Sequence, residues 1–343
     1  MKIAVIGTGW ADKVQIPAFQ HSGNSIVGVY GRNHDKAQEV AQRHGIPTVA
    51  RAWEELLETD AELISITTPP RLHKEQTIAA LQAGKHVLVE KPLAMNQEEV
   101  LEMIAAQQES GLKVMIDHEL RFVPVRKKAK ALVAEGFLGE LLSFSAEKEI
   151  VSTRGRLNPE TPFTWWSDAK EFGGALGALG SHVLDGLYYL LGDGFADVEL
   201  RGSALARAVK ERRDAQGTLH PVTADDLWTA SLALHDAVGS IQVNVASHHE
   251  GRDHVILRGT EGTIKIDSSF HLYVAKAGQD MQEIPCPFDI DIPEAFSKNP
   301  FPAGSVCLGA ELAKGIDNPV LDIAASLEQG LTTQRIMDEA RKV

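Results

Sequence analysis

The chain has 343 residues and a formal net charge of −13, and 43% of its residues are hydrophobic. The acidic balance argues against nucleic acid or an anionic membrane as a partner, because both attract cationic surfaces. Two cysteines without a Cys-x-x-Cys pair argue against a disulfide framework and a structural zinc site. The length predicts two domains. The lack of a leader pattern and of a membrane-spanning apolar run predicts a cytoplasmic protein.

Short apolar runs alternate with helical patterns over the first 120 residues. The segments 33–47 and 97–111 are predicted to be helices: the first has Asn33 or Asp35 as a possible cap and Gly45 as its end, and the second ends at Gly111. Alternation of this kind predicts a parallel, doubly wound α/β sheet. The apolar runs are rich in Val, Ile and Leu, as strands buried on both faces are, and they cover residues 2–7, 25–30, 63–67, 86–90 and 113–117.

Two glycines follow the first predicted strand, in the sequence GTGW at residues 7–10. In a dinucleotide-binding unit the first glycine makes a tight turn, and the second lets the backbone approach a pyrophosphate. The third glycine of the pattern is missing, and position 12 is Asp12. A plain strand–helix turn is the alternative. The surrounding strands and helices favour a cofactor site that includes Gly7, Thr8, Gly9 and Trp10.

The end of the second strand bears on the choice between NAD and NADP. NAD-binding proteins usually place an acidic residue there to hold the ribose hydroxyl. This chain has Gly31 and Arg32 instead. Because an arginine suits a 2′-phosphate, the sequence favours NADP(H). NAD(H) is the alternative cofactor. The alternative is that Arg32 is a solvated loop residue.

The sequence EKP, residues 90–92, follows a predicted strand directly. Ligands of open α/β sheets bind beyond the carboxyl ends of the strands, so Lys91 is expected to point at a nicotinamide. Proline keeps the preceding residue out of helical geometry, and the bond before it could be cis. A second turn, with Thr68, Pro69 and His73, follows the neighbouring strand, and we expect it at the same edge of the sheet.

After about residue 120 the pattern changes to alternation of apolar and polar residues. The segments 226–235, 240–246 and 262–267 show it, and turns separate them. They predict an α+β domain with a large, mostly antiparallel open sheet that has one covered face. The second face is polar and could be solvated or could join two subunits. The last helical segment is expected to pack back across the domains.

The order and spacing of these motifs closely resemble the Gfo/Idh/MocA oxidoreductases, the family of glucose–fructose oxidoreductase and inositol dehydrogenase. The resemblance covers nearly the whole chain. It implies a Rossmann NAD(P)-binding domain over residues 1–120 and a domain for substrate binding and oligomerisation over residues 121–343. The residues that carry it are Gly7, Gly9, Thr68, Pro69, His73, Ala80, Leu81, Glu90, Lys91, Pro92, Arg121, Phe122, Pro124, Gly173, Gly174, Gly180, His182 and Asp185.

The resemblance implies an oxidoreductase that acts on a sugar, a cyclitol or a related polyol or carbonyl, and that forms a homodimer or homotetramer. Lys91 would hydrogen-bond the reacting oxygen, and His182 would be the general acid or base. The alternatives are a surface lysine and a structural histidine beside Asp185. Thr68, Pro69, His73 and Glu90 would join Lys91 at the cofactor.

One position departs from the family pattern. Many members have an aspartate four residues before the histidine, to place the substrate or relay a proton, where this chain has Ala178. In this respect the chain resembles the animal proteins named for a glucose–fructose oxidoreductase domain. One alternative function is therefore a cofactor-binding protein with little turnover, in redox sensing or scaffolding. Another is cofactor-dependent glycoside hydrolysis on the same fold.

The remaining candidates belong to the substrate site or to a metal site. Trp165 and Trp166 could flank a sugar ring or only pack a domain interface, and His118 could face the substrate together with Glu119. His248, His249 and Glu250 look like a metal triad, but they lie at a strand end without suitable partners, so no metal site is predicted. The predicted substrate site comprises Lys91, His118, Arg121, Trp165, Trp166, Ala178 and His182.

Overall fold

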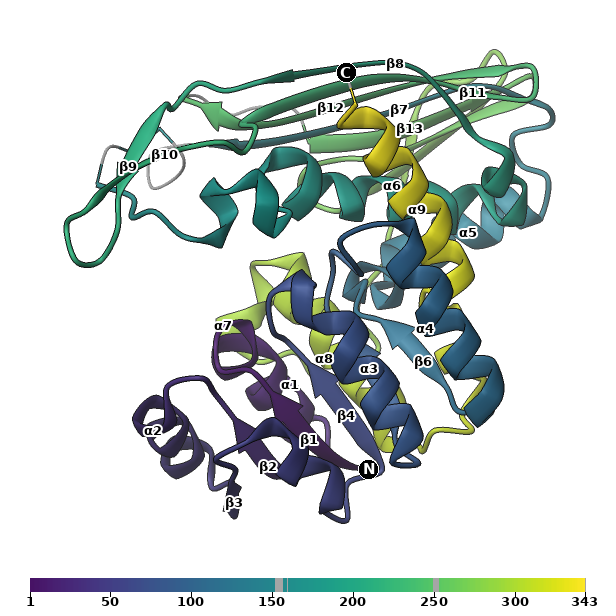
Figure 1. Ribbon diagram of the computed structural model, residues 1–343. Coiled ribbons are helices and arrows are strands. Elements are labelled where there is room, and N and C mark those ends of the chain that lie inside the picture. Colours follow the sequence, from purple (N-terminus) through teal and green to yellow (C-terminus); the bar gives the residue numbers. More distant parts are fainter. Residues whose placement is uncertain (152–156, 159, 249–252, 343) are drawn as a thin grey trace. The chain divides into compact units, whose positions relative to one another are not determined.

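The computed structural model describes residues 1–343 except 152–156, 159, 249–252 and 343 (Figure 1). It divides into two compact units, one formed by Met1–Val123 and Phe288–Leu331, the other by Pro124–Pro287 and Thr332–Val343. The chain therefore passes between the units three times. The sequence predicted one boundary at residue 120. In the structure, the segment Phe288–Leu331 also belongs to the first unit.

Six parallel strands form the sheet of the first unit, in the order β3-β2-β1-β4-β5-β6. This is the doubly wound order, and it confirms the predicted Rossmann-type sheet. All strand carboxyl ends therefore lie at one edge. The strands are β1 (Lys2–Ile6), β2 (Ser25–Tyr30), β3 (Thr48–Val49), β4 (Leu63–Ile66), β5 (His86–Val89) and β6 (Val114–Ile116).

Helices cover both faces of this sheet because its strands are apolar on both sides. In β1, Ile3 and Val5 belong to one core, whereas Ala4 and Ile6 belong to the other. The first core includes residues of α1 (Ile16–His21), α2 (His34–His44) and α8 (Pro300–Ala313), and partly buried Phe296 of α7 (Glu294–Ser297) packs against it. The second core includes residues of α3 (His73–Gln82), α4 (Gln97–Ser110) and the start of α9 (Leu327–Ala340).

Local capping explains where two of these helices begin and end. The side chain of Asn33 accepts a hydrogen bond from the backbone N–H of Lys36 at 3.0 Å, and α2 ends at Gly45 with φ of 66°. In α4, Asn96 accepts from the N–H of Glu99 at 2.9 Å, and the helix ends at Gly111. Asn33, Gly45 and Gly111 set these boundaries as the sequence predicts, and Asn96 is a further cap.

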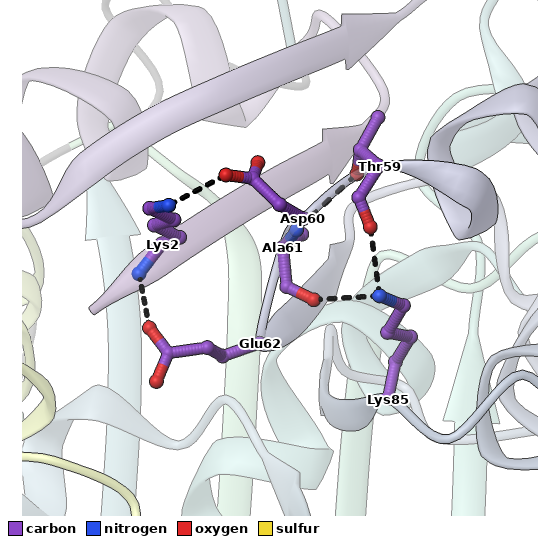
Figure 2. A network of polar contacts seen from close by, with 6 residues as sticks. All are labelled: Lys2, Thr59, Asp60, Ala61, Glu62 and Lys85. Carbon is purple, nitrogen blue, oxygen red and sulfur yellow. Dashed lines mark hydrogen bonds and ion pairs between the residues drawn. The ribbon is translucent and has the colours of Figure 1, made fainter.

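A network of polar contacts joins residues at or just before the amino ends of β1, β4 and β5 (Figure 2). Lys2 pairs with Asp60 at 2.5 Å, and Lys85 Nζ donates to the carbonyl oxygens of Thr59 and Ala61 at 2.8 and 2.9 Å. Lys2 and Asp60 are both exposed, so their pair adds little stability. We therefore assign a structural role to this network.

The second unit contains an eight-stranded sheet in the order β16-β15-β14-β13-β7-β12-β11-β8. All neighbours are antiparallel except β7 and β12, which confirms a mostly antiparallel sheet. A separate hairpin pairs β9 (Glu211–Arg213) with β10 (Leu219–Pro221). The eight strands are β7 (Leu141–Val151), β8 (Glu199–Ala206), β11 (Leu227–Leu234), β12 (Ala237–Ser247), β13 (Asp253–Gly259), β14 (Gly262–Ile266), β15 (Leu272–Lys276) and β16 (Gln282–Ile284).

The two faces of this sheet differ as the alternating pattern predicts. On one face Trp228, Leu232 and Val243 are buried, and α6 (Ser181–Leu191) lies on this side of the sheet together with α5 (Pro124–Ala134) (Figure 1). On the other face Thr229, Ser231 and Ser240 are exposed. Within the described residues, no helix is long and apolar enough to span a membrane.

Candidate active site

The loop after β1 has the backbone that a close approach to a phosphate requires. Gly7 has φ of 123° and donates its N–H to Tyr30 O at 2.8 Å. A Cβ at Gly7 would lie 2.3 Å from Thr67 Oγ1, whereas a Cβ at Gly9 would meet no atom within 4 Å. The tight turn therefore needs the first glycine, and space is open beside the second. These features fit the pyrophosphate of a dinucleotide.

A π-helical turn follows this loop. Trp10 is 37% exposed and caps the turn Ala11–Gln15, which continues without a break into α1. Single π turns inside helices occur frequently at functional sites, because the extra residue changes the direction of the side chains. Here the last residue of the turn, Gln15, is fully buried.

The end of β2 lies beside the same loop. A Cβ at Gly31 would come within 2.8 Å of Thr8 Cγ2 and 2.9 Å of Thr8 Oγ1, so any larger residue would displace the threonine. Arg32 is exposed, and it forms no ion pair with another residue in the part of the chain that the structure describes. The carboxyl ends of β1 and β2 thus bring Thr8 together with Gly31 and leave the Arg32 guanidinium available to a ligand.

His73 connects the two turns that follow β4 and β5. It is completely buried, with Nε2 2.7 Å from Thr68 O and Nδ1 3.0 Å from Pro92 O. Burial lowers the pKa of His73, so the neutral ring predominates near neutrality. One ring nitrogen then donates to one turn. Both of these contacts join His73 to the protein's own backbone. A contact between His73 and a cofactor stays a prediction.

The turn after β4 is ordered by its own side chains as well. Thr68 donates its hydroxyl to Gln76 Oε1 at 2.6 Å, and Pro69 leads into the short 3₁₀ turn Pro70–Leu72. Thr68 and Pro69 remain partly exposed, which leaves both accessible to a ligand.

Lys91 follows β5 at the carboxyl edge of the sheet. Its side chain is partly exposed, and the peptide bond between Lys91 and Pro92 is cis, as the sequence allowed. The backbone N–H of Lys91 donates to Glu90 Oε2 at 3.2 Å. Glu90 is 9% exposed, so its carboxyl lies inside the protein behind the lysine.

Three carboxyls are buried next to this lysine, and only one of them, Glu90, was among the predicted cofactor residues. Burial raises the pKa of Glu90 to about 8 and that of Asp117 to about 6, and it raises the pKa of Glu119 as well. The positive charge of Lys91 acts in the opposite direction on all three. Carboxyls with such shifted pKa values are typical of functional sites.

Gln15 links two of these carboxyls. Its Nε2 donates to Asp117 Oδ2 at 2.5 Å and to Glu90 Oε1 at 3.2 Å, while its Oε1 accepts from Ser65 Oγ at 2.7 Å. Sequence reasoning missed Gln15, Ser65 and Asp117. Two signals could have pointed to them. Asp117 directly follows a strand, and Gln15 stands at a helix position that faces the sheet.

Two other predicted substrate residues of the first unit are buried. Arg121 is 2% exposed, and its Nη1 donates to Gln329 Oε1 at 2.7 Å and to Ile323 O at 3.2 Å. It thereby fastens the segment that returns to this unit. His118 is 4% exposed and precedes the 3₁₀ turn Glu119–Phe122. Substrate contacts of Arg121 and His118 stay predictions.

In the second unit, His182 lies in the first turn of α6. A π turn, Leu176–Gly180, runs directly into this helix, and Ser181 Oγ donates to Gly177 O at 3.0 Å. Ala178 is 1% exposed and His182 is 7% exposed. Ala178 therefore lies within the π turn, and His182 lies in the helix that follows it.

The segment before this π turn is held by close packing. Gly174 has φ of 97°, and a Cβ there would lie 2.4 Å from Asp225 Oδ1. The guanidinium of Arg341 lies 3.6 Å from the centre of the Phe172 ring, and its Nη1 donates to Ala169 O at 3.1 Å. Asp225 accepts from the N–H of Leu176 at 2.8 Å. These contacts fix the backbone that leads into α6.

The two tryptophans of the second unit lie next to each other. Trp165 is 38% exposed, and its ring centre is 6.0 Å from that of Trp166. The carbonyl oxygens of both residues lie within 2.5 Å of a Cβ built at Gly173. Their backbone thus packs on the glycine pair, whereas contact of either ring with a sugar stays a prediction.

The sequence predicts no metal site at His248, His249 and Glu250. His249 and Glu250 lie outside the described residues, and His248 is described as a bend after β12. Within the described ranges, no group of His, Cys, Asp and Glu side chains could hold a metal ion.

Both halves of the chain match known families. Residues 1–118 match the family described as "Oxidoreductase family, NAD-binding Rossmann fold", and residues 127–265 match the "GFO/IDH/MocA C-terminal domain".

Individual relatives support these matches. An uncharacterized oxidoreductase of Synechocystis sp. is 33% identical over 98% of this chain and 92% of its own length. A levoglucosan dehydrogenase of Pseudarthrobacter phenanthrenivorans is 33% identical over 68% of this chain and 62% of its own length. Among solved structures, a levoglucosan dehydrogenase in complex with NADH and levoglucosan has a TM-score of 0.86 at 23% identity, over 100% of this chain and 96% of that one. The last comparison shows the fold.

Proposed function

Because this chain belongs to the Gfo/Idh/MocA family of NAD-binding oxidoreductases, we propose that it transfers a hydride between NADP(H) and a sugar, cyclitol or related polyol or carbonyl. The name of one relative, a levoglucosan dehydrogenase, supports a sugar-like substrate. The buried carboxyls behind Lys91 support chemistry at that lysine, because such groups are costly to bury without a function.

The preference for NADP(H) rests on the contact between Thr8 and Gly31. An acid at position 31 would collide with Thr8, so the usual partner of the ribose hydroxyl has no room there. Arg32 follows directly and is exposed. A guanidinium can bind a 2′-phosphate through two parallel hydrogen bonds.

We assign separate roles to two side chains of the protein. The nicotinamide supplies the hydride chemistry when the cofactor is bound. Lys91 donates a hydrogen bond to the reacting oxygen and stabilises negative charge on it. His182 exchanges a proton with that oxygen as general base or acid. These are the two tasks that the protein must perform.

A turnover screen with NADPH and NADH against sugars, cyclitols and their carbonyl forms tests the proposal. We expect turnover with NADPH for some member of this set. Lys91→Met should abolish turnover and leave NADPH binding nearly unchanged, and His182→Ala should reduce the rate by roughly 100- to 10,000-fold. If both variants keep wild-type turnover on a substrate so found, the roles assigned to these residues are wrong.

A second candidate function is supported by Ala178. This residue is buried and apolar at the position where many family members carry an aspartate, so one polar group for substrate or proton is missing. A cofactor-binding protein with little turnover would share the fold and the cofactor site. NADPH binding without turnover on any substrate of the screen would favour this candidate.

We also propose that the protein acts as a cytoplasmic homodimer or homotetramer. The polar outer face of the eight-stranded sheet supports assembly, because a broad flat face with regular hydrogen-bonding groups can pair with a copy of itself.

A further inference from the structure

Gln15 is the side chain through which the cofactor loop contacts the carboxyls behind Lys91. It ends the π turn after the glycine loop, it is fully buried, and its amide reaches residues that follow two different strands. The contact with Asp117 Oδ2 is 2.5 Å, and the contact with Glu90 Oε1 is 3.2 Å.

The orientation of this amide is fixed by Ser65. The hydroxyl of Ser65 donates to the amide oxygen of Gln15 at 2.7 Å, and the NH₂ group faces the carboxyls. Ser65 is itself fully buried in β4. An amide NH₂ group only donates, so it favours the ionised form of a carboxyl that accepts from it.

The buried carboxyls around this amide outnumber the lysine beside them, so at least one carboxyl is expected to keep its proton. Glu90, Asp117 and Glu119 are all buried, and Lys91 is the cation that acts on each of them. His73, on which the charge of Lys91 also acts, is neutral near pH 7 because burial lowers its pKa. Three ionised carboxyls beside one lysine would leave buried negative charge in excess, which is unfavourable.

The two hydrogen bonds indicate which carboxyl is ionised. Charge-assisted hydrogen bonds are shorter than neutral ones, and the shorter bond of Gln15 goes to Asp117. The second oxygen of Asp117, Oδ1, has no hydrogen-bond partner in the described part of the chain. Asp117 therefore depends on Gln15 to stay ionised, while Glu90 holds a proton.

We propose that Gln15 is a positioning residue for Lys91: its amide, oriented by Ser65, keeps Asp117 ionised while Glu90 retains a proton, and so sets the negative charge beside the lysine. The proposal rests on the proposed function only for its effect on turnover. It places a residue of the cofactor-binding helix in control of the charge at the reacting oxygen.

Carboxyl titration of the cofactor-free protein by ¹³C NMR tests the contact itself. In Gln15→Met, which keeps the length of the side chain and removes the amide, both carboxyls should titrate about one pH unit higher. Ser65→Ala should shift them in the same direction by less, and it covers the case in which Gln15→Met does not fold. The matched control is Gln20→Met, because the amide of Gln20 donates to His44 O, at 2.8 Å, rather than to a carboxyl. Unchanged carboxyl titrations in both test variants would overturn the proposal.

The pH dependence of kcat/KM tests the consequence for catalysis. The acid limb of the profile should move upward by the same interval as the carboxyl titration in Gln15→Met, and it should stay in place in Gln20→Met. A uniform loss of rate with an unmoved limb would show that Gln15 is merely structural, and would overturn the proposal. A wild-type protein without turnover would defeat the proposed function alone, since the NMR titration reads the contact independently.

Discussion

At the scale of single residues, Glu90 shows how burial and charge compete. Burial raises its pKa from the ordinary 4.5 to about 8. The folded protein therefore keeps a proton that the unfolded chain releases over this range. Since the unfolded state then binds fewer protons, stability must fall as the pH rises from about 4.5 to about 8.

Glu90→Gln should flatten this dependence. A glutamine cannot ionise, so the variant should lose the part of the slope that belongs to Glu90, up to about 1.4 kcal/mol per pH unit. Urea unfolding of both proteins between about pH 5 and pH 8 measures the difference. Equal slopes for wild type and variant would show that Glu90 is ionised in the folded protein.

Arg32 is the residue on which the cofactor preference depends. Arg32→Ala should weaken NADPH binding by about 1.5–3 kcal/mol, the value for a hydrogen bond to a charged group, and should weaken NADH binding much less. Fluorescence titration of both cofactors at one salt concentration measures this. Equal affinities of the wild type for the two cofactors would contradict the preference.

At the scale of elements, the backbone before α6 depends on Gly174. Gly174→Ala adds a methyl group at φ of 97°, where it would also meet Asp225 Oδ1 at 2.4 Å. We expect a loss of about 2–4 kcal/mol, from backbone strain and overpacking together. Gly217→Ala is the control, because Gly217 has φ of 84° but nothing within 4 Å of its Cβ. The control should lose about 1–2 kcal/mol. Equal losses in thermal unfolding would mean that Asp225 moves away without cost.

The elements differ in how far the sequence could predict them. Five strands of the first unit were predicted almost to their ends, because they are apolar and buried, whereas the two-residue strand β3 was missed. The alternation in β11 and β12 predicted their covered face. The parallel pairing of β7 with β12 could not be predicted, since it joins segments far apart in the chain.

The sequence predicted the motifs of the candidate site but not the contacts between them. Lys91 and the glycine loop follow from their places after strands. The link from Gln15 to Asp117 does not, because a π turn shifts the helix register and local sequence gives no sign of it. The same holds for the π turn Leu176–Gly180, which contains Ala178 and precedes His182.

At the scale of the whole molecule, the outer face of the eight-stranded sheet carries the proposal of assembly. Ser231 and Ser240 lie directly opposite each other on β11 and β12, and both are exposed. Ser231→Glu combined with Ser240→Glu would place like charges on the proposed pairing surface, which is destabilising. We expect the wild type to sediment as a dimer or tetramer at micromolar concentration and the double variant as a monomer.

The control for this experiment adds the same charge elsewhere. Ser268 and Ser269 are exposed in the turn after β14, so Ser268→Glu with Ser269→Glu should leave the oligomer intact. A monomeric wild type at micromolar concentration would refute the assembly.

The return of Phe288–Leu331 to the first unit has a consequence for biosynthesis. Val306 and Leu308 of α8 belong to the same core as Phe19 and Phe122, so this core stays incomplete until α8 has left the ribosome. Roughly 200 residues separate Val123 from Leu331, and at about 5–20 residues per second their synthesis takes roughly 10–40 s. Throughout that interval the nascent amino-terminal segment exposes the apolar surface that α8 later covers, which makes it a client for chaperones and a source of aggregation whenever translation stalls.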